Sequence, residues 1–297
     1  MELKNMLQVI NNENSRVNMF LVKKHNGGYI TVNPSIKKNI EVDLKKIIET
    51  EIGDKLNCNK KPYNIIGVDD NVIETDNTER YTQISILKES LANPDEKEKI
   101  QARDFDFFLY KVVDEDKNNI FVLRRIKKMK FLKKGIAGNI VNGEFKKMTD
   151  ADGVLAIDDK VDLLFDEDNL YIFQHISMER IFDLKNNFRE NAIKVLERKK
   201  LRDKIVNFDN LKESALKNLN YIKRLAKLEN TDSLLFLDDL GETKKVIDEF
   251  NLDIYVDLDK KKIRFDNPSQ ISAFISLMQD AYYRTLIGNH KGVDERR

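Results

Sequence analysis

The sequence predicts an α+β fold with a mainly antiparallel sheet and flanking helices, divided into two domains. Short apolar runs are joined by connections too short for a parallel crossover, which favours antiparallel neighbours. Longer segments carry apolar residues every three or four positions, which indicates helices. The chain has 297 residues, enough for two domains, and the polar stretch that begins at Asn93-Pro94 predicts a boundary between residues 1–98 and 99–297.

The first predicted domain holds a hairpin and two helices. Strand-like residues 17–23 and 29–32 flank Asn26-Gly27, a frequent hairpin turn. Residues 43–56 have helical spacing. A second helix is predicted to start at Thr78, which acts as its cap, and to stop before Pro94.

The second predicted domain begins with strands and continues with helices. Its last helix should open with a capping box, in which Asn267 is the cap and Gln270 the reciprocal partner. The predicted strands are 105–113, 120–124, 154–157, 161–165 and 170–173; an interrupted helical segment at 178–206 and a helix at 211–228 follow, and then helix 242–250, hairpin 254–258 with 263–265, and helix 268–282.

Composition restricts the class of protein. The 52 basic and 51 acidic residues nearly cancel, so net charge gives no argument for nucleic acid or membrane. The single Cys58 excludes an intramolecular disulfide and is typical of a reducing cytosol. There is no apolar run long enough to span a membrane and no signal peptide. We expect a cytoplasmic protein that reaches a membrane only through a partner.

The common catalytic and cofactor signatures are missing from the sequence. It has no phosphate-binding GxxxxGK[ST] and no GxGxxG after a strand. His25, His175 and His290 lie far apart, and none has the spacing of a metal ligand. We therefore predict no catalytic residue and no cofactor.

Charge reverses in the middle of the chain. Residues 124–147 hold nine Lys and Arg against Glu144, and residues 150–168 hold eight Asp and Glu against Lys160. The basic block is either a phosphate-binding surface or the positive half of an internal charge pairing. We name its first eleven residues the basic run; its bases are Arg124, Arg125, Lys127, Lys128, Lys130, Lys133 and Lys134.

A second basic element lies further along the chain. On a helical wheel of residues 211–228, apolar side chains share one side, and Lys223 and Arg224 fall mostly on the other. Lys199, Lys200 and Arg202 come just before this helix. The two basic elements together would suit a DNA surface, although a solvated helix is the more common use of such residues.

The acidic block supports an alternative. Metal-dependent cleavage of DNA needs convergent carboxylates, which Asp158, Asp162 and Asp166 would have to supply. The next strand offers Gln174-His175-Ile176, without the acid and lysine of a restriction-type nuclease. The simpler interpretation is that these acidic residues lie in hairpin turns, where aspartate is frequent.

One segment matches a known pattern. The run GEFKKMTDADGVLAIDDKVDLLFDEDNLYIFQHISMERIF resembles the KwaB family of the Kiwa anti-phage defence system, in which a basic segment, an apolar–Asp strand and a hairpin lead to a phenylalanine-rich helix start. Met178 stands here at the first phenylalanine position of that helix. Leu277, Asp280 and Tyr283 look like the closing Leu-x-x-Asp-x-x-Tyr motif of the family, with departures at Arg284 and Ile287, and the likeness covers residues 105–297.

The resemblance implies a cytosolic DNA-binding effector without established catalysis. It also implies a homo-oligomer that acts with a membrane-embedded KwaA-like sensor protein. Together with the basic elements, it leads to the hypothesis of non-enzymatic, largely sequence-independent binding of double-stranded DNA through phosphate contacts. The alternatives are the metal-dependent nuclease and a protein-interaction component whose charges satisfy one another.

Overall fold

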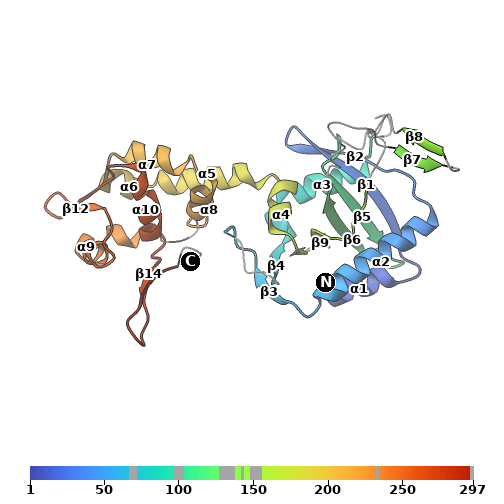
Figure 1. Cartoon of the computed structure of the whole chain (residues 1–297), viewed down its shortest axis with the longest axis horizontal. Coiled ribbons are helices and arrows are strands. Elements are labelled where there is room, and N and C mark those ends of the chain that lie inside the picture. The colour runs from blue at the N-terminus through green and yellow to red at the C-terminus, as the bar shows by residue number, and fades with distance from the viewer. Residues whose placement is uncertain are drawn as a thin grey trace. The chain divides into compact units, whose positions relative to one another are not determined.

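Two structural units, each with a sheet of its own, make up the chain in the computed structural model (Figure 1). The first contains Met1–Tyr63 and Val68–Phe182, and the second contains Asn64–Gly67 and Asp183–Arg297. The structure describes residues 1–66, 72–95, 104–126, 156–229, 231 and 234–294, together with the backbone of 138–141 and 144–147.

An eight-stranded sheet forms the centre of the first unit, in the order β2-β1-β5-β6-β9-β10-β4-β3. Its neighbouring strands are antiparallel except for β3 and β4, which confirms the predicted fold class. The strands are β1 (Arg16–His25), β2 (Gly28–Val32), β3 (Asn59–Pro62), β4 (Val72–Asn77), β5 (Phe107–Val113), β6 (Asn119–Arg125), β9 (Leu163–Phe165) and β10 (Asn169–Ile172).

Local sequence explains the first hairpin. Asn26 and Gly27, with φ of 46° and 78°, form the turn between β1 and β2. Asparagine and glycine tolerate these left-handed conformations, which match the twist of the flanking strands. The predicted hairpin is confirmed.

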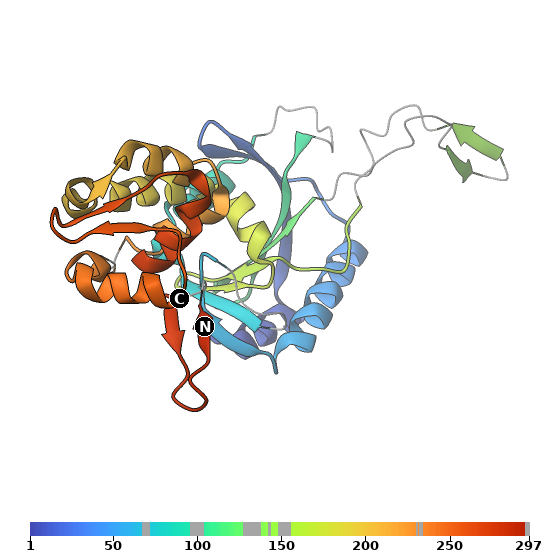
Figure 2. The ribbon, with the colours of Figure 1, turned by 60° about the vertical axis from the view of Figure 1, so that its left-hand side comes forward.

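The central strands are covered on both faces. Along β5, Phe108, Tyr110 and Val112 join the core beneath helices α1 (Leu3–Asn11) and α2 (Lys38–Lys55). The alternate residues of β5 point to the opposite face of the sheet, on the side of α3 (Thr82–Ala92) and α4 (His175–Ile181). Figure 2 shows this arrangement from a second direction. A sheet buried on both faces needs nearly continuous apolar strands, which is the pattern of β5 and β6.

The two units do not divide at the predicted boundary of residues 98 and 99. Strand β1 pairs with β5 over seven residue pairs, from Arg16↔Val113 to Val22↔Phe107, so both sides of that boundary belong to one sheet. The polar residues at Pro94 follow α3 inside the first unit. The division falls instead between Phe182 and Asp183, at the start of α5.

Helices surround a three-stranded sheet in the second unit, with the order β11-β13-β12. The capping box predicted at Asn267 and Gln270 is present. The elements are α5 (Leu184–Leu196), α6 (Lys199–Lys204), β11 (Ile205–Val206), α7 (Phe208–Ala215), α8 (Leu219–Ala226), α9 (Leu240–Glu249), β12 (Tyr255–Asp257), β13 (Lys262–Arg264), α10 (Ile271–Met278), and a hairpin of β14 (Tyr282–Arg284) and β15 (Lys291–Val293).

Several predicted elements are wrong in extent. The helix expected over 211–228 is two helices, because the chain leaves the helical conformation after Leu216 and Asn218 caps α8. The final helix ends at Met278, and Tyr282 lies in a strand. Thr78 begins a 3-10 turn whose cap is Asn77. Residues 156–157 are not in a strand, and 154–155 lie outside the described residues.

Candidate nucleic-acid interface

The basic run begins on strand β6. Arg124 and Arg125 are the last two residues of β6 and the first two of the run. Ile126 is the last described residue before the remainder of the run. The predicted contacts Lys127, Lys128, Lys130, Lys133 and Lys134 lie outside the described residues.

Arg124 is a structural residue rather than a surface one. Its guanidinium makes a bidentate contact with Asp158, in which Nε donates to Oδ1 at 2.7 Å. The Nη1 group donates to Asp162 Oδ1 at 2.5 Å. Only 6% of Arg124 is exposed. Burial by itself would lower the pKa of Arg124, but the two carboxylates outweigh it and raise the pKa. The expectation that Arg124 faces phosphate is therefore corrected: the internal charge pairing accounts for this arginine.

Arg125 has a different environment from its neighbour. Its backbone N–H donates to Asp162 Oδ2 at 2.7 Å, while its half-buried side chain lines a pocket at the end of β6. Successive residues of a strand point to opposite faces, so the same charge is buried at one position and accessible at the next. Arg125 remains a candidate for anion contact.

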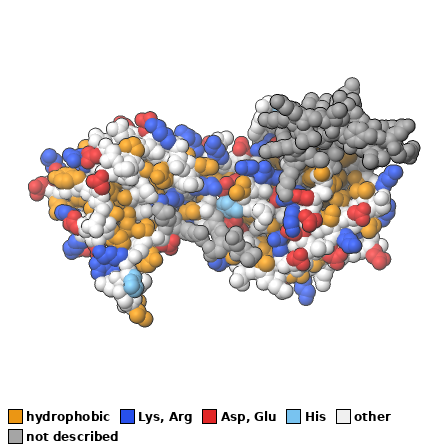
Figure 3. All heavy atoms as spheres, viewed as in Figure 1, with side chains coloured by type: hydrophobic (Ala, Val, Ile, Leu, Met, Phe, Trp, Pro, Cys, Tyr) orange, Lys and Arg blue, Asp and Glu red, His pale blue; other side chains and the backbone are white. Residues whose placement is uncertain are grey.

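The second basic element belongs to the second unit. Lys199 and Arg202 are exposed on α6, and Lys200 forms an ion pair with Asp238. Lys223 on α8 lies over the Phe188 ring, 6.0 Å from its centroid. Basic and acidic side chains are interspersed over the visible surface of this unit in Figure 3.

The helical wheel predicted that Arg224 lies on the outer face of its helix, but the structure buries this side chain. It is 6% exposed, and its guanidinium donates to Gln279 Oε1 at 2.7 Å and to Ser276 Oγ at 2.8 Å. The wheel assumed one unbroken helix from residue 211, whereas the break before Asn218 resets the rotation of α8. Arg224 joins α8 to the end of α10 instead of facing solvent.

The three acidic residues of the nuclease alternative do not converge on one site, because Asp158 and Asp162 share Arg124 and Asp166 lies elsewhere. Asp162 precedes β9 and Asp166 follows it, at opposite ends of the strand. Asp162 is held by Arg124, whereas Asp166 Oδ1 accepts the backbone N–H groups of Asp168 and Asn169 at 2.8 and 2.7 Å. Within the described residues, no group of three His, Cys, Asp or Glu side chains has an arrangement that could hold a metal ion. Asp166 is a turn residue, as the simpler interpretation holds.

Sequence reasoning missed a half-buried cluster around His175. Its Nδ1 lies 2.7 Å from Glu74 Oε2 and its Nε2 lies 3.0 Å from Glu179 Oε1. The Tyr63 ring stacks on the imidazole at a centroid distance of 5.3 Å. The four-residue spacing of His175 and Glu179 was the available signal. Glu74 comes from the distant strand β4 and could not be paired with His175 by sequence.

This cluster should make the stability of the protein depend on pH. Burial by itself would lower the pKa of His175, but the hydrogen bonds that the imidazole donates to Glu179 and Glu74 outweigh it and raise the pKa to about 9. An unfolded histidine titrates near 6.5. The stabilisation is thus fully present below about pH 6.5 and is lost as pH rises towards 9.

We expect wild type to lose about 1–2 kcal/mol of unfolding free energy, relative to His175→Gln, between pH 6.5 and 9, after solvent screening is allowed for. Urea unfolding of both proteins at several pH values measures this difference, and other titrating groups cancel in it. Parallel pH profiles for the two proteins would contradict a charged imidazole.

Comparison with known proteins gives one family. The model of the family described as "Kiwa protein KwaB-like" matches residues 102–288. No curated protein and no solved structure matches the chain. Among the described residues, no helix is both long and apolar enough to cross a membrane.

Proposed function

Because this chain belongs to the KwaB-like family of Kiwa proteins, and so has a role in Kiwa anti-phage defence, we propose that it acts there by binding double-stranded DNA. The observation that carries the proposal is the basic run itself, which has seven bases and no acid in eleven residues. Of the two bases of the run that the structure describes, Arg124 is neutralised inside the fold, and Arg125 forms no ion pair with the described residues. A local concentration of positive charge attracts a polyanion even when the net charge is near zero.

Additional contacts come from the second unit. Lys199 and Arg202 are exposed and make no ion pair with the described residues. Lys200 and Lys223 are half-buried and would contribute less, because each already interacts with a neighbour. Arg124 and Arg224 are left out of the proposed interface, since both are buried and hydrogen-bonded. The contacts are to phosphates, so little sequence preference is expected.

Fluorescence anisotropy of a labelled duplex, titrated with the full chain at several salt concentrations, tests the proposal. Six phosphate contacts, one for each base of the run except Arg124, give a log–log salt slope of about −5, at roughly −0.9 per contact. A parallel gel with Mg²⁺ should show intact DNA. Cleavage in that gel would favour the nuclease alternative, and no binding at low salt would favour the protein-interaction alternative.

We also propose self-association and a membrane-embedded KwaA-like partner. The hairpin of β14 and β15 supports self-association, because Leu286 and Ile287 at its tip are 104% and 90% exposed. Adjacent apolar side chains in full contact with water favour burial against another surface. Sedimentation velocity of the purified chain tests this, and a monomer at all concentrations would count against it.

A further inference from the structure

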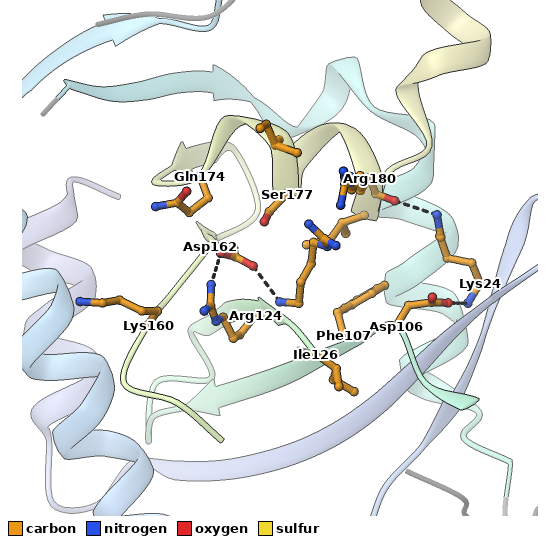
Figure 4. Close-up of a pocket in the computed structure, with 13 residues that line it drawn as sticks. Lys24, Asp106, Phe107, Arg124, Ile126, Lys160, Asp162, Gln174, Ser177 and Arg180 are labelled. Atoms are coloured by element: carbon orange, nitrogen blue, oxygen red, sulfur yellow. Dashed lines mark hydrogen bonds and ion pairs between the residues drawn. The ribbon is translucent and has the colours of Figure 1, made fainter. Parts of the chain in front are cut away.

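A pocket of about 810 Å³ opens in the first unit, where the ends of β1, β5 and β6 approach helix α4 (Figure 4). Its lining includes Phe107, Ile126 and Ile181 as apolar residues and Ser177 as a hydroxyl. Volumes of a few hundred to a thousand Å³ are typical of small-molecule sites. The lining residues belong to one unit, so the pocket does not depend on how the two units are arranged.

The pocket carries more positive than negative charge. Five basic residues line it against two acids. Three of the bases already have partners: Arg124 binds Asp158 and Asp162, Lys160 Nζ lies 3.1 Å from Glu51 Oε2, and Lys24 Nζ donates to the Arg180 carbonyl at 2.8 Å. The two that remain are Arg125 and Arg180.

The guanidinium groups of Arg125 and Arg180 have no ion pair or hydrogen bond with the described residues. Burial lowers the pKa of Arg125, and the positive charge of Arg180 lowers it further, against smaller opposing effects of Asp162 and Asp106. The nearby carboxylates are already engaged, since Asp162 accepts from Arg124 and Asp106 Oδ2 accepts the Lys24 backbone N–H at 2.9 Å. Two neighbouring cations that form no ion pair with the described residues make a site that an anion would stabilise.

We propose that this pocket binds a phosphomonoester of nucleotide size, with Arg125 and Arg180 holding the phosphate. Guanidinium groups donate parallel hydrogen bonds that match phosphate oxygens. Among the apolar lining residues, Ile126 and Ile176 have accessible surface, and their side chains suit a nucleobase or sugar. A pocket of this size admits one nucleotide but not a duplex, so it takes a different ligand from the proposed duplex surface, with which it shares Arg125 but not Arg180. The phosphomonoester comes either from a free nucleotide or from the 5′ end of a DNA strand.

Isothermal titration of the full chain at low salt tests the site with four probes: AMP, adenosine, and a short thymidine oligonucleotide with and without a 5′ phosphate. We expect the phosphorylated form of at least one pair to bind at least about 10-fold more tightly than its unphosphorylated counterpart. Arg125→Gln and Arg180→Gln should each remove most of that preference. Arg80→Gln is the matched control, because Arg80 is an exposed arginine of the same unit that already pairs with Asp76.

The outcomes separate the two sources. Arginine-dependent binding of AMP assigns the pocket to free nucleotides, and arginine-dependent binding of the phosphorylated oligonucleotide alone assigns it to strand ends. The proposal is overturned if the wild type shows no preference for the phosphorylated probes, or if both variants keep that preference. Arg180 is exposed, so its variant tests the site without disturbing the core. Duplex affinity of Arg180→Gln, measured separately, reports on the proposed function and not on this pocket, because Arg180 is not among the proposed duplex contacts.

Discussion

Replacing Arg124 by leucine is expected to lower the free energy of unfolding by about 3–5 kcal/mol, the usual cost of removing one partner of a buried ion pair. Asp162 is fully buried, and its carboxylate would lose its only cationic partner among the described residues. The loss would also release Asp158 from the bidentate contact that connects the segment before β9 to β6. Leucine fills the volume but cannot compensate the charge.

Urea unfolding followed by circular dichroism measures this effect, and the neighbouring residue supplies the control. Arg125→Leu changes the same residue type on the same strand, yet Arg125 is half-buried and pairs with no described carboxylate. Its cost should stay within about 1 kcal/mol, as for substitutions away from buried networks. Equal losses in the two variants would show that the ion pair of Arg124 contributes little beyond packing.

Reversing Lys127, Lys128 and Lys130 to glutamate is expected to weaken duplex binding by at least about 100-fold near 0.1 M salt, because three phosphate contacts become repulsive. The log–log salt slope should also become shallower by about 3, at roughly 0.9 per lost contact. Anisotropy with the labelled duplex measures both quantities. A loss of affinity together with a shallower salt slope identifies phosphate contacts. Misfolding would lower the affinity without changing the slope in proportion to the number of lost contacts.

A control variant carries the same change in net charge elsewhere. Lys244, Lys245 and Lys260 are ion-paired with acids on the surface of the second unit. Reversing these three lysines should leave the affinity within a few-fold of wild type. If instead both triple variants lose affinity equally, binding follows net charge and the basic run is no specific interface. Unchanged affinity in the first variant would remove the run from the proposal.

Features that depend on neighbours along the chain could be predicted from the amino-acid sequence. The Asn26-Gly27 hairpin, the Asn267 and Gln270 capping box, and the strands on either side of residues 114–118 follow from turn chemistry and side-chain period, and all are present. The antiparallel sheet follows as well, because short connections allow little else. The concentration of bases in residues 124–134 is also a property of the sequence alone.

Which charges are available to a ligand could be seen only in the folded chain. Arg124 and Arg125 are identical in type and adjacent, yet Arg124 is buried against two aspartates and Arg125 lines a pocket with Arg180. Arg224 turned inward because α8 is a separate helix. The pairing of β1 with β5 likewise placed the division between units at Phe182 rather than near Pro94. All these cases have the same cause, because burial and ion pairing depend on residues brought together from distant parts of the chain. Neither the composition nor the spacing of apolar residues along the sequence shows those contacts.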